Sequence, residues 1–129
     1  MLEASLKNTR LTETENLALQ RYLSLITKEP KVYQISLFGS KAKGDVHEDS
    51  DVDIAVFVNT EYDNMFINRI INTASELLFE MGLLGEIFLR PTVIFNEDLL
   101  YNKRFVENIL REGIMLWKEE KSYQIFRTS

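Results

Sequence analysis

"SLFGSKAKGDVHEDSDVDIAVF", residues 36–57, places a Gly-Ser pair and an acidic run between two apolar segments. Asp51 and Asp53 stand one residue apart, where the second apolar segment begins. Alternate residues of an extended strand point to the same side, so both carboxylates are expected to point toward one place. Three kinds of structure contain such a run: a solvated loop, a calcium-binding loop, or a metal-assisted phosphoryl-transfer site.

The spacing excludes the common calcium and phosphate loops. An EF-hand loop requires a glycine after its alternating acids, and Ile54 stands there instead. Gly39 and Gly44 have the glycine spacing of a Walker P-loop, but Asp45 and Val46 follow where Lys and Ser or Thr are needed. A dinucleotide-binding fingerprint requires three glycines in its own spacing, and only two are present here.

A solvated loop is the simplest interpretation of the charges alone, but a phosphate site explains more of the residues. Gly39 would let a phosphate approach the backbone, where a side chain would block it. Ser40 could donate its hydroxyl and its N–H to that phosphate at the start of a short helix formed by "KAK". Asp51 and Asp53 would hold Mg²⁺, a hard cation that prefers oxygen ligands. A third carboxylate would complete a site for two metal ions.

The composition indicates one globular domain over residues 1–129 and argues against several classes of ligand. The chain has 129 residues, 45% of them hydrophobic, and a net charge of −5. Its 15 basic residues are scattered among 20 acidic ones, so we expect no extended nucleic-acid footprint. There is no cysteine to form a disulfide or ligate zinc, and the single histidine, His47, cannot build a histidine-rich metal site.

The apolar segments are too short for a bilayer, which requires about 20 consecutive residues. The first residues, "MLEASLKNTRLTETENLALQ", lack the basic and then apolar blocks of a signal peptide. We therefore expect no membrane association and a cytoplasmic location.

Periodicity, capping residues and turn residues predict an α/β (α+β) domain with a small mixed sheet flanked by helices. Pro91 argues that its strand lies at a sheet edge, and residues 119–129 read as a tail. The expected elements are a helix from the Thr12–Glu15 capping box to Pro30, strands at 31–38 and 52–58, a helix capped by Asp63 and ended by Gly82, a strand at 86–95, a helix capped by Asn96 and ended by Gly113, and a short strand or helical turn at 114–117.

The motif "GSKAKGDVHEDSDVDIAV" resembles the signature of the minimal nucleotidyltransferases of the polymerase-β superfamily: Gly-Ser, ten residues, then Asp-x-Asp opening a strand. The resemblance implies the polymerase-β-like nucleotidyltransferase fold. It also implies transfer of a nucleoside monophosphate from a nucleoside triphosphate to an acceptor, with release of pyrophosphate. By the same resemblance, Gly39 and Ser40 bind the nucleotide, and Asp51 and Asp53 are the catalytic metal ligands.

The family's third acid lies on the strand after the long helix, where this chain reads "EIFLRPTVIF". Aligning that strand places Arg90 or its neighbour at the acid's position, and Glu86 is the strand's only carboxylate. Either Glu86 serves as third ligand, or the acid is missing and catalysis is weak or lost. Arg90 would face the nucleotide or pair with Glu86. For Lys41 and Lys43 the sequence favours solvated side chains over phosphate contacts.

Many bacterial members of this family are antitoxins of HEPN-domain toxins, so the resemblance implies a HEPN partner. It implies Mg²⁺, with room for two ions, and ATP as the donor of AMP to a toxin tyrosine. A second hypothesis is a non-catalytic antitoxin that blocks its partner by occlusion, and a third is a small-molecule nucleotidyltransferase. The sequence leaves the oligomeric state open.

Overall fold

The computed structural model describes residues 11–43 and 51–120. The long helices and the strands follow one another along these residues in the predicted order. The elements are α2 (Glu13–Ile26), β1 (Val32–Phe38), α3 (Ser40–Lys43), β2 (Val52–Val58), α4 (Asn64–Glu80), β3 (Leu89–Ile94), α5 (Asp98–Tyr101), α6 (Lys103–Glu112) and β4 (Ile114–Lys118).

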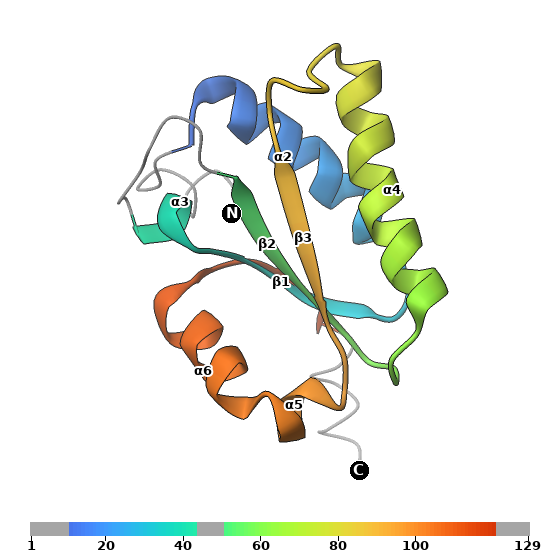
Figure 1. The fold of residues 1–129 in the computed structure, drawn as a ribbon, viewed down its shortest axis with the longest axis vertical. Helices are drawn as coiled ribbons and strands as arrows, with labels where there is room; N and C mark the ends of the chain where they lie inside the picture. Colours follow the sequence, from blue (N-terminus) through green and yellow to red (C-terminus); the bar gives the residue numbers. More distant parts are fainter. Residues whose placement is uncertain (1–10, 44–50, 121–129) are drawn as a thin grey trace.

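The four strands form one mixed sheet in the order β3-β2-β1-β4. β1 is antiparallel to both β2 and β4, whereas β2 and β3 are parallel. Figure 1 shows β2 and β3 running between α4 and α6. β3 is an edge strand, which explains how the sheet accommodates Pro91, a residue with no N–H to donate. The small mixed sheet flanked by helices is thus confirmed.

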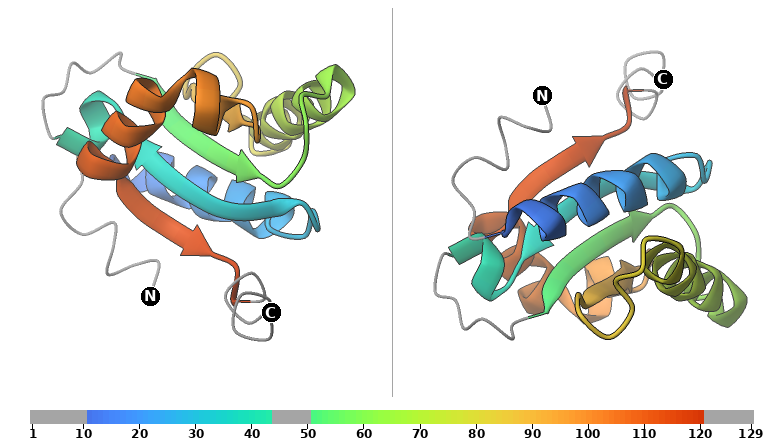
Figure 2. Two further views of the ribbon diagram at one scale, coloured as in Figure 1. Left: turned by 90° about the horizontal axis from the view of Figure 1, so that it is seen from below. Right: turned by 90° about the horizontal axis from the view of Figure 1, so that it is seen from above.

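β2 is the buried centre of the fold, as its continuous apolar run predicted. Val52, Ile54 and Val56 belong to a core cluster that includes side chains of α2 and α4. Ala55 and Phe57, which alternate with them, belong to a second cluster with side chains of α6. The helices therefore cover both faces of the sheet, and Figure 2 shows this arrangement from two further directions.

The predicted helix starts are confirmed at α2 and α4. Thr12 accepts a hydrogen bond from the Glu15 N–H at 3.1 Å, and the Glu15 carboxylate accepts one from the Thr12 N–H at 2.9 Å, which completes the capping box. Asp63 caps α4 by accepting from the Met65 and Phe66 N–H groups. α2 ends at Ile26, before Pro30.

The prediction of one helix capped by Asn96 is wrong, because the structure has two shorter helices there. The Asp98 carboxylate accepts from the Phe95 N–H at 2.8 Å and also from the Asn102 side chain. Asn102 itself has a non-helical backbone, with φ −119° and ψ 38°. This conformation of Asn102 separates α5, which ends at Tyr101, from α6, which begins at Lys103.

The last strand of the described residues decides between the two alternatives predicted for residues 114–117. Residues 114–117 are strand rather than helical turn, since β4 (Ile114–Lys118) pairs with β1. The Glu119 N–H donates to the Tyr33 carbonyl at 2.8 Å, so the first residue of the expected tail still contacts the sheet. Residues 121–129 of that tail and His47 lie outside the described residues. Within the described part of the chain, no helix is long and apolar enough to cross a membrane.

Candidate active site

The Gly-Ser pair and the aspartate pair meet at one end of the sheet, where β1 ends and where β2 and β3 begin (Figure 1). Phe38, the last residue of β1, lies opposite Asp53 in the antiparallel pairing. Asp53 lies opposite Arg90 in the parallel pairing of β2 with β3. The sheet register therefore places Gly39, Asp53 and Arg90 next to one another.

Gly39 is required here for two reasons. Its φ is +74°, a left-handed conformation that glycine adopts without strain. A Cβ atom at this position would also overlap Oδ2 of Asp53. The motif predicted a glycine that lets a phosphate approach, and the structure adds that this glycine makes room for an aspartate.

Ser40 follows directly and begins α3, as predicted, although this helix has only four residues. The Gly39 carbonyl accepts hydrogen bonds from the Ala42 and Lys43 N–H groups, each at 3.2 Å. The turn is thus held in place beside the aspartate pair. That Gly39 and Ser40 bind a nucleotide stays a prediction.

Both carboxylates of the pair face one guanidinium group. Arg90 donates from Nη1 to Oδ2 of Asp51 at 3.3 Å, and its Nε lies 4.0 Å from Oδ1 of Asp53. The pKa of Asp53 is raised, chiefly because the carboxyl group is partly buried. The Arg90 guanidinium lowers this pKa by a smaller amount, and the negative charge of Asp51 raises it. The expected pairing of Arg90 with Glu86 is wrong, because Arg90 pairs with the two aspartates.

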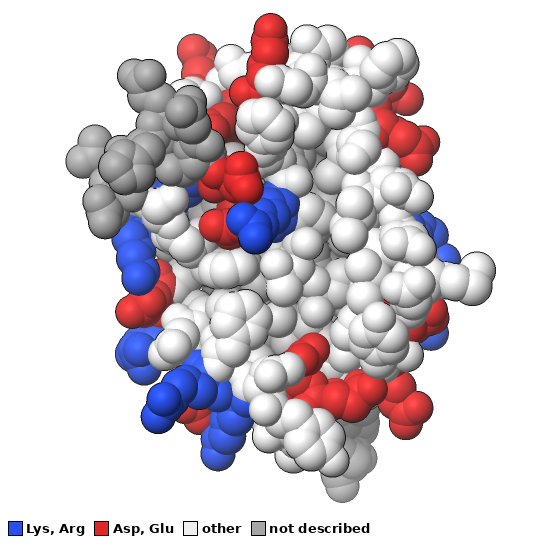
Figure 3. Space-filling view, viewed as in Figure 1, with Lys and Arg blue, Asp and Glu red and all other residues white. Residues whose placement is uncertain are grey.

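Figure 3 shows this part of the surface. Basic and acidic atoms adjoin above the beginnings of β2 and β3, and the described surface to the right of them in this view is mostly uncharged. The side chain of Arg90 is 69% exposed, and those of Asp51 and Asp53 are 36% and 22% exposed. The site is therefore open to a ligand from solvent.

The described residues of the site fit one magnesium ion better than two. Mg²⁺ in phosphate-transferring proteins binds one or two carboxylates plus phosphate oxygens of the substrate. Asp51 and Asp53 supply such a pair. Among the residues that the structure describes, no group of three or more Asp, Glu, His or Cys side chains could hold a metal.

Glu86 does not extend β3, contrary to its predicted place on that strand. β3 begins at Leu89, and Glu86 lies in an exposed turn between Leu84 and Ile87, which form an isolated bridge. Its N–H donates to the Leu83 carbonyl. Glu86 therefore joins no metal-binding group with the aspartates, and Arg90 occupies the position opposite Asp53.

The lysines next to the Gly-Ser pair are already paired with carboxylates. Lys41 is 1% exposed and lies 3.0 Å from Oε1 of Glu15, so the prediction of a solvated side chain is wrong. Lys43 lies 3.0 Å from Oε2 of Glu112 at the surface. No sequence signal links Lys41 to Glu15, which is 26 residues away in another helix. Lys41 fixes α3 against α2 instead of reaching toward a phosphate.

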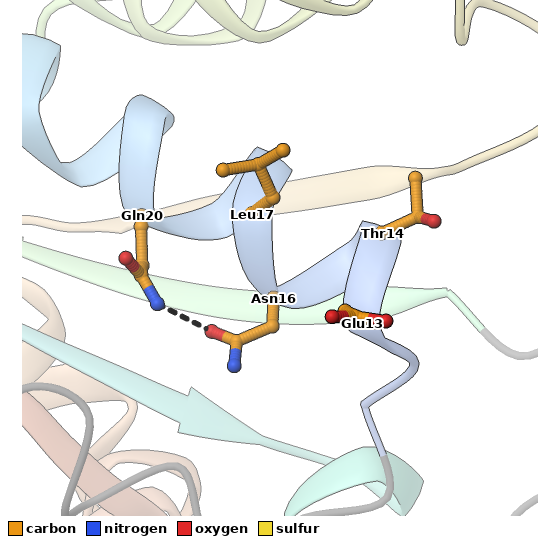
Figure 4. A pocket seen from close by; sticks show the side chains of 5 residues that line it. All are labelled: Glu13, Thr14, Asn16, Leu17 and Gln20. Atoms are coloured by element: carbon orange, nitrogen blue, oxygen red, sulfur yellow. Dashed lines mark hydrogen bonds between the residues drawn. The ribbon is translucent and has the colours of Figure 1, made fainter.

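A depression of about 430 Å³ lies along the outer side of α2 (Figure 4). Five residues of that helix line it, and the Gln20 amide donates to the Asn16 side chain at 2.9 Å across it. None of the five belongs to the aspartate pair or the Gly-Ser turn. This depression is separate from the candidate active site.

A Gly-Ser turn beside an Asp-x-Asp strand on a mixed sheet is the arrangement of a nucleotidyltransferase. Residues 20–122 match the family model described as polymerase beta, nucleotidyltransferase. The chain therefore belongs to this family.

Two relatives are similar to the chain in sequence. It is 31% identical over 87 residues to "Putative protein adenylyltransferase MJ0604" of Methanocaldococcus jannaschii, covering 67% of this chain and 80% of that protein. It is 32% identical over 99 residues to "Protein adenylyltransferase MntA" of Aphanizomenon flos-aquae, covering 75% of this chain. The chain spans 64% of the length of that second relative.

A solved structure shares the fold. The structure described as "toxin-antitoxin with AMP-PNP" superposes with a TM-score of 0.54 at 21% sequence identity, covering 85% of this chain and 78% of that one. At this level of identity the likeness supports the fold alone.

Proposed function

We propose that this protein is a Mg²⁺-dependent nucleotidyltransferase that transfers AMP from ATP to a tyrosine hydroxyl of a HEPN-domain toxin and so acts as an antitoxin. The observation that carries the proposal is the close approach of Gly39 to the Asp53 carboxylate, which places the Gly-Ser turn beside a pair of carboxylates. The names of the two relatives, both protein adenylyltransferases, agree with it. The cytoplasmic location and the single domain over residues 1–129 belong to the same proposal.

Each residue of the site has a role in this reaction. Gly39 and Ser40 receive the triphosphate, with the Ser40 hydroxyl and N–H as donors. Asp51 and Asp53 would hold the magnesium ion, which supplies positive charge to the phosphate oxygens when it is bound. The acceptor oxygen attacks the α-phosphorus, the bond to pyrophosphate breaks, and the hydroxyl proton passes to water.

The exposure of the site favours a protein as acceptor. The carboxylate of Asp51 and the guanidinium of Arg90 lie at the surface, and Phe88 beside them on the chain is 51% exposed. A tyrosine on a partner's surface can reach such a site. A small acceptor molecule would find fewer groups to hold it beside side chains as exposed as those of Asp51 and Arg90.

A second candidate function is inhibition of the partner by occlusion, without catalysis. Arg90 favours it, because a cation lies opposite Asp53 where the family has its third acid. With two carboxylates alone, we expect transfer to be slow.

Nucleotide binding tests the proposal directly. Calorimetric titration with α,β-methylene-ATP, which cannot be cleaved at the α–β bond, should show binding that depends on Mg²⁺. The double variant Asp51→Asn, Asp53→Asn should stay folded and lose the Mg²⁺ dependence, since amides hold this ion poorly. Equal binding by both proteins with and without Mg²⁺ would contradict a metal site at the aspartates.

A further inference from the structure

Arg90 has an unusual place for a basic side chain in a site made to hold a cation. It projects from an edge strand, opposite Asp53 in the sheet register, and lies between the two carboxylates. Its contacts at 3.3 Å to Asp51 and 4.0 Å to Asp53 neutralise part of the pair's charge. Among the described residues, no other Lys or Arg is ion-paired with either aspartate.

We infer that Arg90 is a nucleotide-binding residue that changes partner: in the free protein it is the counter-ion of Asp51 and Asp53, and in the complex it binds the triphosphate. This inference rests on the proposed function. The guanidinium has to leave the carboxylate oxygens when a divalent cation takes them, because the two positive charges would share the same ligands.

The position of Arg90 allows this movement. Its side chain is 69% exposed and stands on an edge strand, so little packing holds it against the aspartates. Exposed ion pairs of this kind contribute little to stability and are easily exchanged. A guanidinium binds phosphate oxygens through two parallel hydrogen bonds, so the released side chain has a better partner in a triphosphate.

Charge balance gives Arg90 a reason to bind the nucleotide. One divalent cation cannot neutralise two carboxylates and a triphosphate together. The described residues hold no third acid for a second ion, and the nearest lysines, Lys41 and Lys43, are paired with Glu15 and Glu112. Arg90 can supply the positive charge that a second ion supplies in a two-metal site.

Two affinities that move in opposite directions test the inference. The Arg90→Gln variant should bind free Mn²⁺, followed by electron paramagnetic resonance, about two- to fivefold more tightly than the wild type, since its aspartates have lost a counter-ion. The same variant should bind Mg²⁺ with α,β-methylene-ATP about tenfold more weakly or worse, since a charged hydrogen bond to phosphate is lost.

Two further variants control the measurement. Arg69→Gln removes the same charge from a surface ion pair with Glu29, on another part of the molecule, and should change neither affinity. Arg90→Lys keeps the charge without the two parallel donors, so it should leave the Mn²⁺ affinity near that of the wild type and still weaken nucleotide binding. Unfolding curves establish that each variant is folded.

The outcomes separate this inference from the proposed function. Unchanged affinities in Arg90→Gln, or a nucleotide affinity that rises, would overturn the inference while the wild type still binds nucleotide. If the wild type binds no Mg²⁺–nucleotide complex at all, the proposed function fails first.

Discussion

At the scale of single residues, the site depends on how closely Gly39 and Asp53 approach each other. The backbone of Gly39 leaves no space for a Cβ beside Oδ2 of Asp53, and its φ of +74° disfavours other residues as well. The two effects can be separated, because Gly82 has a similar φ of +71° and open space around its missing Cβ.

Gly39→Ala and Gly82→Ala should therefore differ in their affinity for the Mg²⁺–nucleotide complex more than in their free energy of unfolding. Each forces an L side chain into a left-handed conformation, at a cost of about 1–2 kcal/mol in unfolding free energy. Only Gly39→Ala displaces the Asp53 carboxylate, so only this variant should lose affinity for the Mg²⁺–nucleotide complex. Urea unfolding and calorimetric titration measure the two effects. Equal nucleotide affinity in both variants would remove Gly39 from the site.

The sequence predicted which residues form the site better than it predicted their contacts. Gly39, Ser40, Asp51 and Asp53 came from a short motif whose spacing is local, and the structure brings them together. Arg90 came from a strand alignment, and its pairing with the aspartates depends on the parallel register of β2 and β3. A register between two segments almost 40 residues apart cannot be derived from either segment alone.

At the scale of elements, the short helix α3 needs an anchor because four residues make little helix by themselves. The anchor is the ion pair between Lys41 and Glu15, whose side chains are 2% and 9% exposed. Glu15 also completes the capping box of α2. One carboxylate thus joins the start of α2 to the turn that carries Gly39 and Ser40.

Breaking this pair should be costly. Lys41→Met leaves the buried Glu15 carboxylate without its cation and should lower the free energy of unfolding by about 3–5 kcal/mol. Lys43→Met is the matched control, because its pair with Glu112 is about half exposed on both sides; we expect a change of about 0.5 kcal/mol or less. Urea unfolding measures both. A Lys41 variant as stable as the Lys43 variant would show that the pair does not hold α3.

Element boundaries were predictable where the signal was local. The capping box of α2 and the Asp63 cap of α4 read directly from neighbouring residues and are confirmed. The break at Asn102 was missed, because an apolar repeat continues through it and the break is the non-helical backbone of that one residue. The burial of Lys41 was missed for a different reason: lysine is seldom buried, and its partner lies in another helix.

At the scale of the whole molecule, the strand order places the site beside an outer strand, at the end of the sheet where β2 and β3 begin. β3 is the outer strand beside β2, and it carries Arg90 at the surface. A partner protein can therefore approach the aspartates without passing between the helices and strands that the structure describes. The order of elements and the mixed sheet could be predicted from the sequence, whereas the strand order required the structure.

The reaction proposed for this end of the sheet is the transfer of a nucleotide to a protein. The most direct measurement incubates the chain with Mg²⁺, ATP labelled at the α-phosphorus, and a HEPN-domain toxin whose growth arrest the chain relieves in cells. The account predicts slow labelling of a toxin tyrosine, none from ATP labelled at the γ-phosphorus, and none with the double variant Asp51→Asn, Asp53→Asn. An unlabelled toxin, together with a double variant that relieves growth arrest as well as the wild type, would contradict the account and leave occlusion as the function.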